Sequence, residues 1–167
     1  TNAGLWSDVD ASDVVTLSAS TGDVSRNADG TWEWSFNSAD GPDESQTVVI
    51  TADDGNGGVT TTSFELTVNN VAPTVTAVSS SNGTLETKSV DGSVSISGSF
   101  SDPGIDTHVI TVSWGDGTVE DISVDQIGDS FQGSHDYATG GIFVITVTAT
   151  DSDGETSAAL TTQAVVQ

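Results

Sequence analysis

A strict alternation of apolar and polar residues runs through most of the chain and constrains its fold more than any other feature. The segments TWEWSFNS (31–38), SVSISGSF (93–100) and FVITVTATD (143–151) place apolar side chains at every second position. A period of two residues, enriched in β-branched and aromatic side chains, is typical of strands with one buried face. Because no segment keeps the period of about 3.6 residues that marks a helix, we expect an all-β protein.

Short turn-forming clusters separate these strands. Gly, Asn and Asp gather in NADG (27–30), DDGNGG (53–58), WGDGT (114–118) and DSDG (151–154). Many short strands at this spacing favour antiparallel β-sandwiches over parallel α/β layers.

The alternating pattern occurs twice along the chain. Residues 4–20 align with residues 98–114, and VVITADDGNGG (48–58) aligns with FVITVTATDSDGE (143–155). A nearly constant offset between the two pairs indicates two copies of one module.

The repeat defines two domains. We predict two tandem immunoglobulin-like antiparallel β-sandwiches, residues 1–70 and 74–167, joined by a linker over residues 71–73. Pro73 stiffens this linker and forces Ala72 into an extended conformation.

The charge of the chain limits its partners. Arg26 and Lys88 stand against 25 acidic residues, which gives a formal net charge of −23. Such a surface repels phosphate backbones and anionic lipid, so we expect no nucleic-acid partner, while divalent cations are natural counter-ions. The chain has no cysteine, which excludes a disulfide scaffold and thiolate metal sites. No run of about 18 apolar residues occurs, so we expect no direct membrane insertion. The low lysine content and abundant Ser, Thr, Asp and Gly favour an extracellular location.

The second copy carries the motifs of a known family. Its WGDGT turn and the later segment SHDYATGGIFVITVTATDSDG (134–154) resemble the PKD domain, an immunoglobulin-like β-sandwich of bacterial and animal surface proteins. The residues that match the family pattern are Trp114, Gly115, Asp116, Gly117, His135, Tyr137, Gly141 and Asp151. This resemblance implies a spacer, an adhesive unit or an appendage of a secreted hydrolase for residues 74–167.

The first copy lacks both the WGDG turn and the His-x-Tyr motif. Its acidic loop, its DDG turn and the NNVAP linker make residues 1–70 similar to the cadherin-like and immunoglobulin-like repeats of large bacterial surface proteins, some of which are adhesins.

Catalysis has little support in the sequence. Ser134, His135 and Asp136 are the residue types of a catalytic triad, but they are consecutive, and neighbours on a strand point to opposite faces. We interpret His108, close to Asp106, as a histidine at the start of a strand that faces solvent or caps a loop. We therefore expect no enzymatic activity and no catalytic residues.

Calcium binding is a better use for the acidic residues. Calcium takes about six to eight oxygen ligands from carboxylates, amides and backbone carbonyls, and the B–C and F–G loops of an immunoglobulin-like sandwich lie at the same end. The candidates in the second module and the linker are Asn69, Asn70, Asp102, Asp106, Asp151 and Asp153. The candidates in the first module are Asp8, Asp10, Asp13, Asp54 and Asn56. The alternative is that these residues only form turns, and we favour that reading for Asp23, Asp29 and Asp116, which lack converging partners.

The tryptophans are predicted to be core residues and not a sugar-binding platform. Trp32 and Trp34 share a face, Trp114 is in register with an inward-facing valine and isoleucine, and Trp6 aligns with Phe100.

These observations predict a non-enzymatic, calcium-binding structural repeat of a large extracellular or cell-surface bacterial protein, such as an adhesin stalk or surface filament. Its partners would be neighbouring repeats of the same protein or copies of itself, with a polysaccharide or cell-surface ligand as a further possibility. The alternative is an accessory module that binds carbohydrate for a secreted hydrolase, which an exposed strip of aromatic side chains would favour.

The first module is predicted to lack its first strand. In the second module, a strand near 75–78 and another ending at Phe100 precede the acidic loop, whereas the matching loop of the first module starts at Asp8. Either the chain was cut inside a longer array, which we favour because repeats of this kind normally continue on both sides of any one copy, or a neighbouring copy supplies the strand by β-augmentation. The segment ALTTQAVVQ (159–167) is predicted to be the last strand of the second module or partly such a donor.

Overall fold

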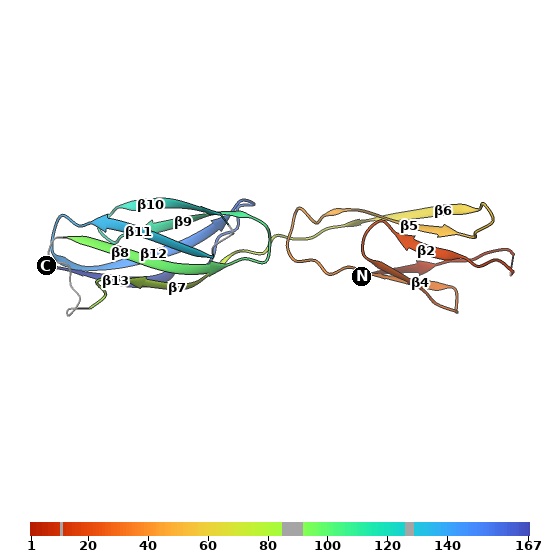
Figure 1. Ribbon diagram of the computed structural model, residues 1–167, viewed down its shortest axis with the longest axis horizontal. Helices are drawn as coiled ribbons and strands as arrows, with labels where there is room; N and C mark the ends of the chain where they lie inside the picture. The colour runs from red at the N-terminus through yellow and green to blue at the C-terminus, as the bar shows by residue number, and fades with distance from the viewer. Residues whose placement is uncertain (11, 85–91, 126–128) are drawn as a thin grey trace. The chain divides into compact units, whose positions relative to one another are not determined.

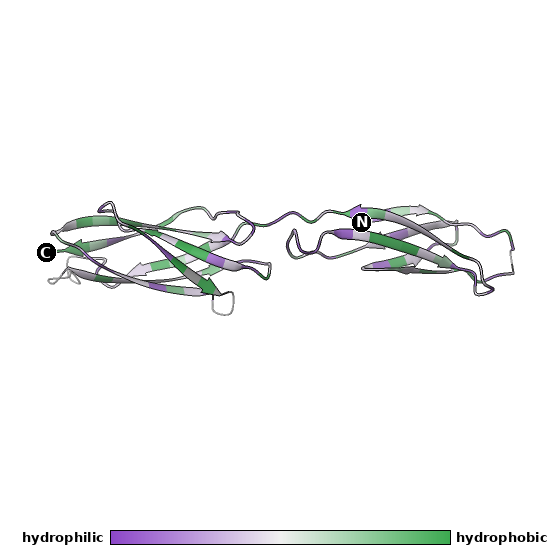
Figure 2. Ribbon diagram, turned by 90° about the horizontal axis from the view of Figure 1, so that it is seen from above, coloured by the Kyte–Doolittle hydropathy of each residue, from purple (hydrophilic) through white to green (hydrophobic). Residues whose placement is uncertain are grey.

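The fold was analysed in a computed structural model that describes residues 1–10, 12–84, 92–125 and 129–167. All regular elements in these ranges are β-strands, which confirms the predicted all-β fold class. The chain divides into two compact units, Thr1–Asn69 and Asn70–Gln167, and this division falls next to the predicted linker. Figure 2 shows apolar residues concentrated on the strands of both units. In the described part of the chain, no helix is long and apolar enough to cross a membrane.

The first unit is a sandwich of two small antiparallel sheets (Figure 1). One sheet has the strand order β1-β4-β3 and the other has the order β2-β5-β6. The strands are β1 (Asn2–Leu5), β2 (Thr16–Ala19), β3 (Asp23–Arg26), β4 (Thr31–Ser35), β5 (Gln46–Asp53) and β6 (Val59–Leu66).

The core of the first unit forms from the inward positions of the alternating strands. Trp32 and Trp34 on β4 are 6% and 2% exposed and pack with Val48 and Ile50 of β5, so the predicted core role of both tryptophans is confirmed. Trp6 differs from the prediction, because its side chain is only half-buried against this core.

The second unit is a larger sandwich. One sheet has the order β11-β8-β7 and the other has the order β10-β9-β12-β13, with every pairing antiparallel. Its strands are β7 (Thr74–Ser80), β8 (Ser93–Ser101), β9 (Thr107–Ser113), β10 (Val119–Asp125), β11 (Ser130–Asp136), β12 (Gly141–Asp151) and β13 (Leu160–Val166).

The core of the second unit is centred on Trp114, which is fully buried, as predicted. The Tyr137 hydroxyl donates a hydrogen bond of 2.8 Å to the backbone carbonyl of Trp114, tying the segment after β11 to the end of β9. Gly115 follows with φ 82°, and a Cβ there would lie 2.5 Å from the Val144 carbonyl oxygen. The WGDG turn therefore needs glycine at this position for both conformation and space.

The two units share a pattern of pairing. In the repeat alignment β1 corresponds to the end of β8, and both strands pair with a later strand of their own unit, β4 and β11 respectively. In the second unit β7 pairs with the other edge of β8. Among the described residues of the first unit, no strand pairs with the equivalent edge of β1.

Candidate metal sites

Three carboxylates of the first unit lie together. Asp8 and Asp13 belong to the loop between β1 and β2, and Asp54 belongs to the turn between β5 and β6. One carboxylate oxygen from each of the three lies within 4.8 Å of the others. Two loops that are distant in sequence thus bring three of the predicted ligands to one place.

The Asp54 carboxylate is held by the backbone of its own turn. Its Oδ1 accepts hydrogen bonds from the amides of Asn56 (2.7 Å) and Gly58 (2.8 Å). These bonds hold the pKa of Asp54 below its ordinary value, so the group carries a negative charge at neutral pH. A Cβ at Gly58 would meet the other carboxylate oxygen at 2.2 Å, so glycine allows this close approach.

The other two predicted ligands of the first unit have different surroundings. Asp10 lies outside the group of three, and its Oδ1 accepts bonds from the amide (3.1 Å) and hydroxyl (2.8 Å) of Ser12. These bonds lower the pKa of Asp10. Asn56 reaches Asp54 through its backbone amide.

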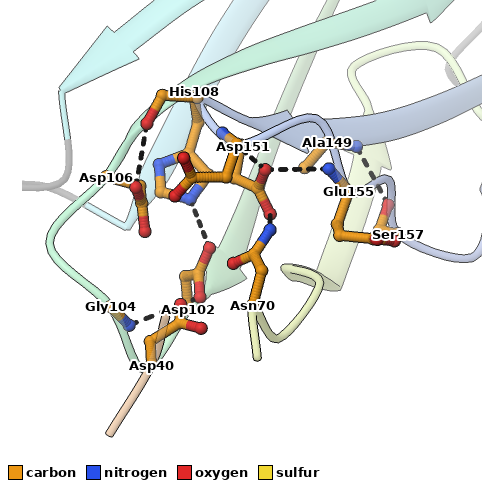
Figure 3. A network of polar contacts seen from close by, with 12 residues as sticks. Asp40, Asn70, Asp102, Gly104, Asp106, His108, Ala149, Asp151, Glu155 and Ser157 are labelled. Atoms are coloured by element: carbon orange, nitrogen blue, oxygen red, sulfur yellow. Dashed lines mark hydrogen bonds and ion pairs between the residues drawn. The ribbon is translucent and has the colours of Figure 1, made fainter. Parts of the chain in front are cut away.

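In the second unit, the loop between β8 and β9 contributes two neighbouring acids. Asp102 and Asp106 have carboxylate oxygens within 4.8 Å of each other. Asp102 Oδ2 lies 2.7 Å from Nε2 of His108, and Asp106 Oδ1 accepts a 2.8 Å bond from the hydroxyl of Ser152. The loop between β8 and β9 (the B–C loop) is therefore in direct contact with the turn between β12 and β13 (the F–G turn). Figure 3 shows the side chains around this contact.

Asp151 connects the F–G turn to the start of the second unit. It is 6% exposed, and its Oδ2 accepts a 3.0 Å bond from Nδ2 of Asn70. Its Oδ1 accepts bonds from the amides of Asp153 (3.0 Å) and Glu155 (2.9 Å). In the described part of the chain, the Oδ1 atom of Asn70 is buried and has no hydrogen-bond partner.

The two remaining predicted ligands of this region, Asp153 and Asn69, are both exposed. Asp153 takes part in the Asp151 interaction through its backbone amide. Asn69 is the last residue of the first unit.

The sequence interpretation of His108 is wrong in one respect. The side chain does not face solvent: His108 is 2% exposed and packs 4.7 Å from the ring of Phe100. The sequence could have predicted this burial, because alternate residues of a strand share a face and His108 alternates on β9 with Ile110 and Val112, which face the core. An inward histidine beside a short acidic loop predicts a carboxylate partner, since buried polar groups are normally hydrogen-bonded.

Asp116 also differs from its interpretation as an isolated turn residue. It accepts the amide of Thr118 (2.9 Å), as a turn aspartate does, but its Oδ2 also lies 2.7 Å from Nε2 of His135. The bond from His135 is the main reason that the pKa of Asp116 falls to about 2. The His135 ring stacks on Trp114 with centroids 5.1 Å apart.

Comparisons with known proteins give one described likeness. No family model and no curated protein sequence matches the chain. Among solved structures, the chain is similar to the PKD domain of an M14-like peptidase from the archaeon Thermoplasmatales SCGC AB-540-F20. The match has 22% sequence identity and a TM-score of 0.46, and it covers 58% of this chain and 97% of the other. It names the same family that the motifs of residues 74–167 resemble.

Proposed function

We propose that this chain is a non-enzymatic, calcium-binding structural repeat of a large extracellular or cell-surface bacterial protein, of the kind that forms an adhesin stalk or surface filament. Its partners are neighbouring repeats of the same protein or copies of itself. Calcium neutralises carboxylates that the fold holds close together and joins the loops that carry them.

The grouping of Asp8, Asp13 and Asp54 carries this proposal. Their carboxylate oxygens lie within 4.8 Å of one another in a chain with only two strong bases and a net charge of −23. Like charges at this separation repel each other, and the hydrogen bonds that lower the pKa of Asp54 oppose relief by protonation. A hard divalent cation with oxygen ligands relieves the repulsion.

The second unit supports the same chemistry by a different route. Asn70 Oδ1 is a buried acceptor without a partner in the described residues, beside the buried carboxylate of Asp151. A buried polar atom left unpaired is costly, and an amide oxygen next to a carboxylate suits calcium. Asp102 and Asp106 add two further carboxylates on the loop that contacts the Asp151 turn.

The alternative function, a carbohydrate-binding module of a secreted hydrolase, has less support. Aromatic binding platforms need exposed rings, whereas Trp32, Trp34 and Trp114 are at most 6% exposed. Trp6 is half-buried, and the guanidinium of Arg26 lies 4.8 Å from the centre of its ring.

Thermal unfolding with and without calcium tests the proposal. Extracellular modules bind calcium with dissociation constants of about 10⁻⁴–10⁻³ M. At about 100 times the dissociation constant, an ion that binds only the folded state stabilises it by about 2.7 kcal/mol. For a unit of this size the midpoint should therefore rise by about 10–20 °C between chelator and saturating calcium.

Asp54→Asn is the informative variant, because it removes the charge but keeps an oxygen to accept the turn amides. It should abolish most of the calcium-dependent rise of the first unit. Asp29→Asn is the matched control, since Asp29 accepts the amide of Thr31 in a similar turn outside the group of three. Equal responses of the two variants, or no response of the parent chain to calcium, would contradict the proposal.

A further inference from the structure

One side of the first sandwich is open between β1 and β6. The Trp6 amide donates a hydrogen bond to the Gly30 carbonyl (2.8 Å). The backbone groups of even-numbered residues of β1 therefore bond to β4, and those of the odd-numbered residues Ala3 and Leu5 point to the free edge of β1. The Ala3 amide is one of these, and its partner is the side chain of the preceding residue, Asn2 Oδ1, at 2.8 Å. In the described residues, this edge therefore retains backbone groups that a further strand could bond.

The opposite wall of the opening is also uncovered. Thr60 and Thr62 of β6 lie directly across from Ala52 and Ile50 of β5, on the face that packs into the sandwich. Both threonines are nevertheless exposed. Residues on the inner face of a complete sandwich are normally covered by the facing sheet.

The second unit shows what covers these positions. On β13, Leu160 and Thr162 lie across from Val147 and Ile145 of β12, in the same relation, and both are half-buried. Strand β7 lies against β13 and pairs with β8, so it closes the same side of the sandwich (Figure 1). The first unit has an opening where the second unit has β7.

The opening is an uncharged groove. It contains a pocket of about 260 Å³ between the two sheets. Its apolar walls come from Trp6, Leu17, Trp32 and Ile50, and no residue that lines it carries a charge. In a chain with a net charge of −23, a neutral apolar strip of this kind suits a neutral partner.

Strand β7 defines the chemistry of that partner. Its sequence TVTAVSS carries no charged side chain, which matches the uncharged groove. Val75 is 8% exposed and Val78 packs against the core of the second unit. The intervening Thr76 and Ala77 are both exposed, and the pairing register with β8 shifts between Val75 and Ala77, which lets both valines face inward. An extended neutral segment with two inward valines therefore satisfies both the free edge and the apolar walls.

We propose that the groove between β1 and β6 binds an extended strand of this chemistry, supplied by a neighbouring repeat that adds to the free edge of β1. This inference rests on the proposed function, which provides the neighbouring repeat that supplies the strand. Strands β7 and β13 are already paired within the second unit, so the donor is a segment other than these. Backbone bonds to Ala3 and Leu5 give affinity, and the two valine positions give specificity.

A peptide with the sequence of residues 73–81 is the probe, and the full chain is the receptor. Backbone amide NMR should show saturable shifts at β1 and β6, including the amides of Ala3 and Leu5. A peptide with Val75→Asp and Val78→Asp should not bind. Ala3→Pro removes a free-edge donor without breaking the β1–β4 ladder and should weaken binding about tenfold. Ala3→Ser keeps the donor and is the matched control, with binding like the parent.

A covalent version protects the test from weak binding. Residues 73–81 placed ahead of Thr1 through a short flexible linker reach an effective concentration of about 1 mM. The first unit should then melt about 5 °C higher than the same fusion with the two Asp substitutions. No shift with the peptide and no stabilisation in the fusion would overturn the inference. Concentration-dependent self-association that shifts the same amides without peptide would also overturn it, by identifying a second copy as the occupant.

Both measurements are made with calcium and with chelator. Strand binding without any response to calcium would contradict only the calcium part of the proposed function. A calcium response without strand binding would contradict only this inference.

Discussion

Replacing Tyr137 by phenylalanine tests how the second unit is held together. The hydroxyl donates to the carbonyl of Trp114 at 2.8 Å, and the side chain is only 6% exposed. Its ring stacks on Phe143 with centroids 4.2 Å apart and meets His135 edge-on at 4.6 Å. Tyr137→Phe keeps these ring contacts and removes a single donor.

The expected cost follows from the partner left behind. Leaving a buried carbonyl without its donor lowers the free energy of unfolding by about 1–3 kcal/mol, which is more than the net contribution of an ordinary hydrogen bond. For a unit of about 100 residues, each kcal/mol lowers the melting midpoint by about 4–8 °C, so we expect a decrease of between about 4 and 24 °C. Urea unfolding followed by the NMR signal of the Trp114 indole, which separates this unit from the three tryptophans of the first, measures the free energy, and the slope with urea should stay unchanged.

Thr76→Val is the control for this experiment. Thr76 shares a 2.8 Å hydrogen bond with the hydroxyl of Ser99, but both side chains are in contact with solvent. Its loss should change the free energy of unfolding by less than about 0.5 kcal/mol. If Tyr137→Phe is equally neutral, the hydroxyl does not hold the segment after β11 to Trp114, and the reasoning is refuted.

Three further predictions concern the same unit. Burial, with the charge of Asp116, raises the pKa of Tyr137 to about 12, so the one tyrosine of the chain should titrate near pH 12 by ultraviolet absorbance. Because this tyrosine ionises at lower pH in the unfolded chain, the free energy of unfolding should fall between about pH 10 and 12. A titration midpoint near pH 10 in the folded protein would contradict the burial of Tyr137. The pKa of Asp116 is about 2 against an ordinary 3.8, so its contribution to the free energy of unfolding is present above about pH 3.8 and is lost as the pH falls towards 2. In acid unfolding, Asp116→Asn should be less stable at neutral pH and should lose less stability over this range than the parent. An unchanged acid profile would exclude the pairing with His135. In chemical denaturation, Gly115→Ala should lower the free energy of unfolding by more than Gly117→Ala. Both glycines have positive φ, but only Gly115 has a backbone oxygen 2.5 Å from the added Cβ. Equal losses would mean that conformation alone requires glycine at position 115.

The fold class could be read from the sequence because alternation reports burial directly. Trp32, Trp34 and Trp114 were assigned to the core by parity alone, and all three are buried. The alternation pattern was less informative for Trp6, because the burial of this side chain depends on whether a strand covers the open side of the first sandwich. A sequence pattern identifies the face of a strand but not what packs against it.

The candidate sites were predicted in part. The grouping of Asp8 and Asp13 with Asp54 followed from the expected meeting of two loops. The pairs His108–Asp102 and His135–Asp116 did not follow, because each depends on side-chain directions across two strands or a turn. Parity could have revealed the burial of His108, whereas no local pattern places His135 beside Asp116, 19 residues earlier.

Calcium binding is the central claim, and its most direct test is the ratio of bound calcium to protein. The chain is dialysed against about 10 mM calcium, a saturating concentration for sites of this class, and bound metal is counted by elemental analysis against the dialysate. The parent chain should hold at least one calcium ion, Asp54→Asn should hold one fewer, and Asp29→Asn should match the parent. A parent chain with no bound calcium, or the same ratio in all three proteins, would contradict the account.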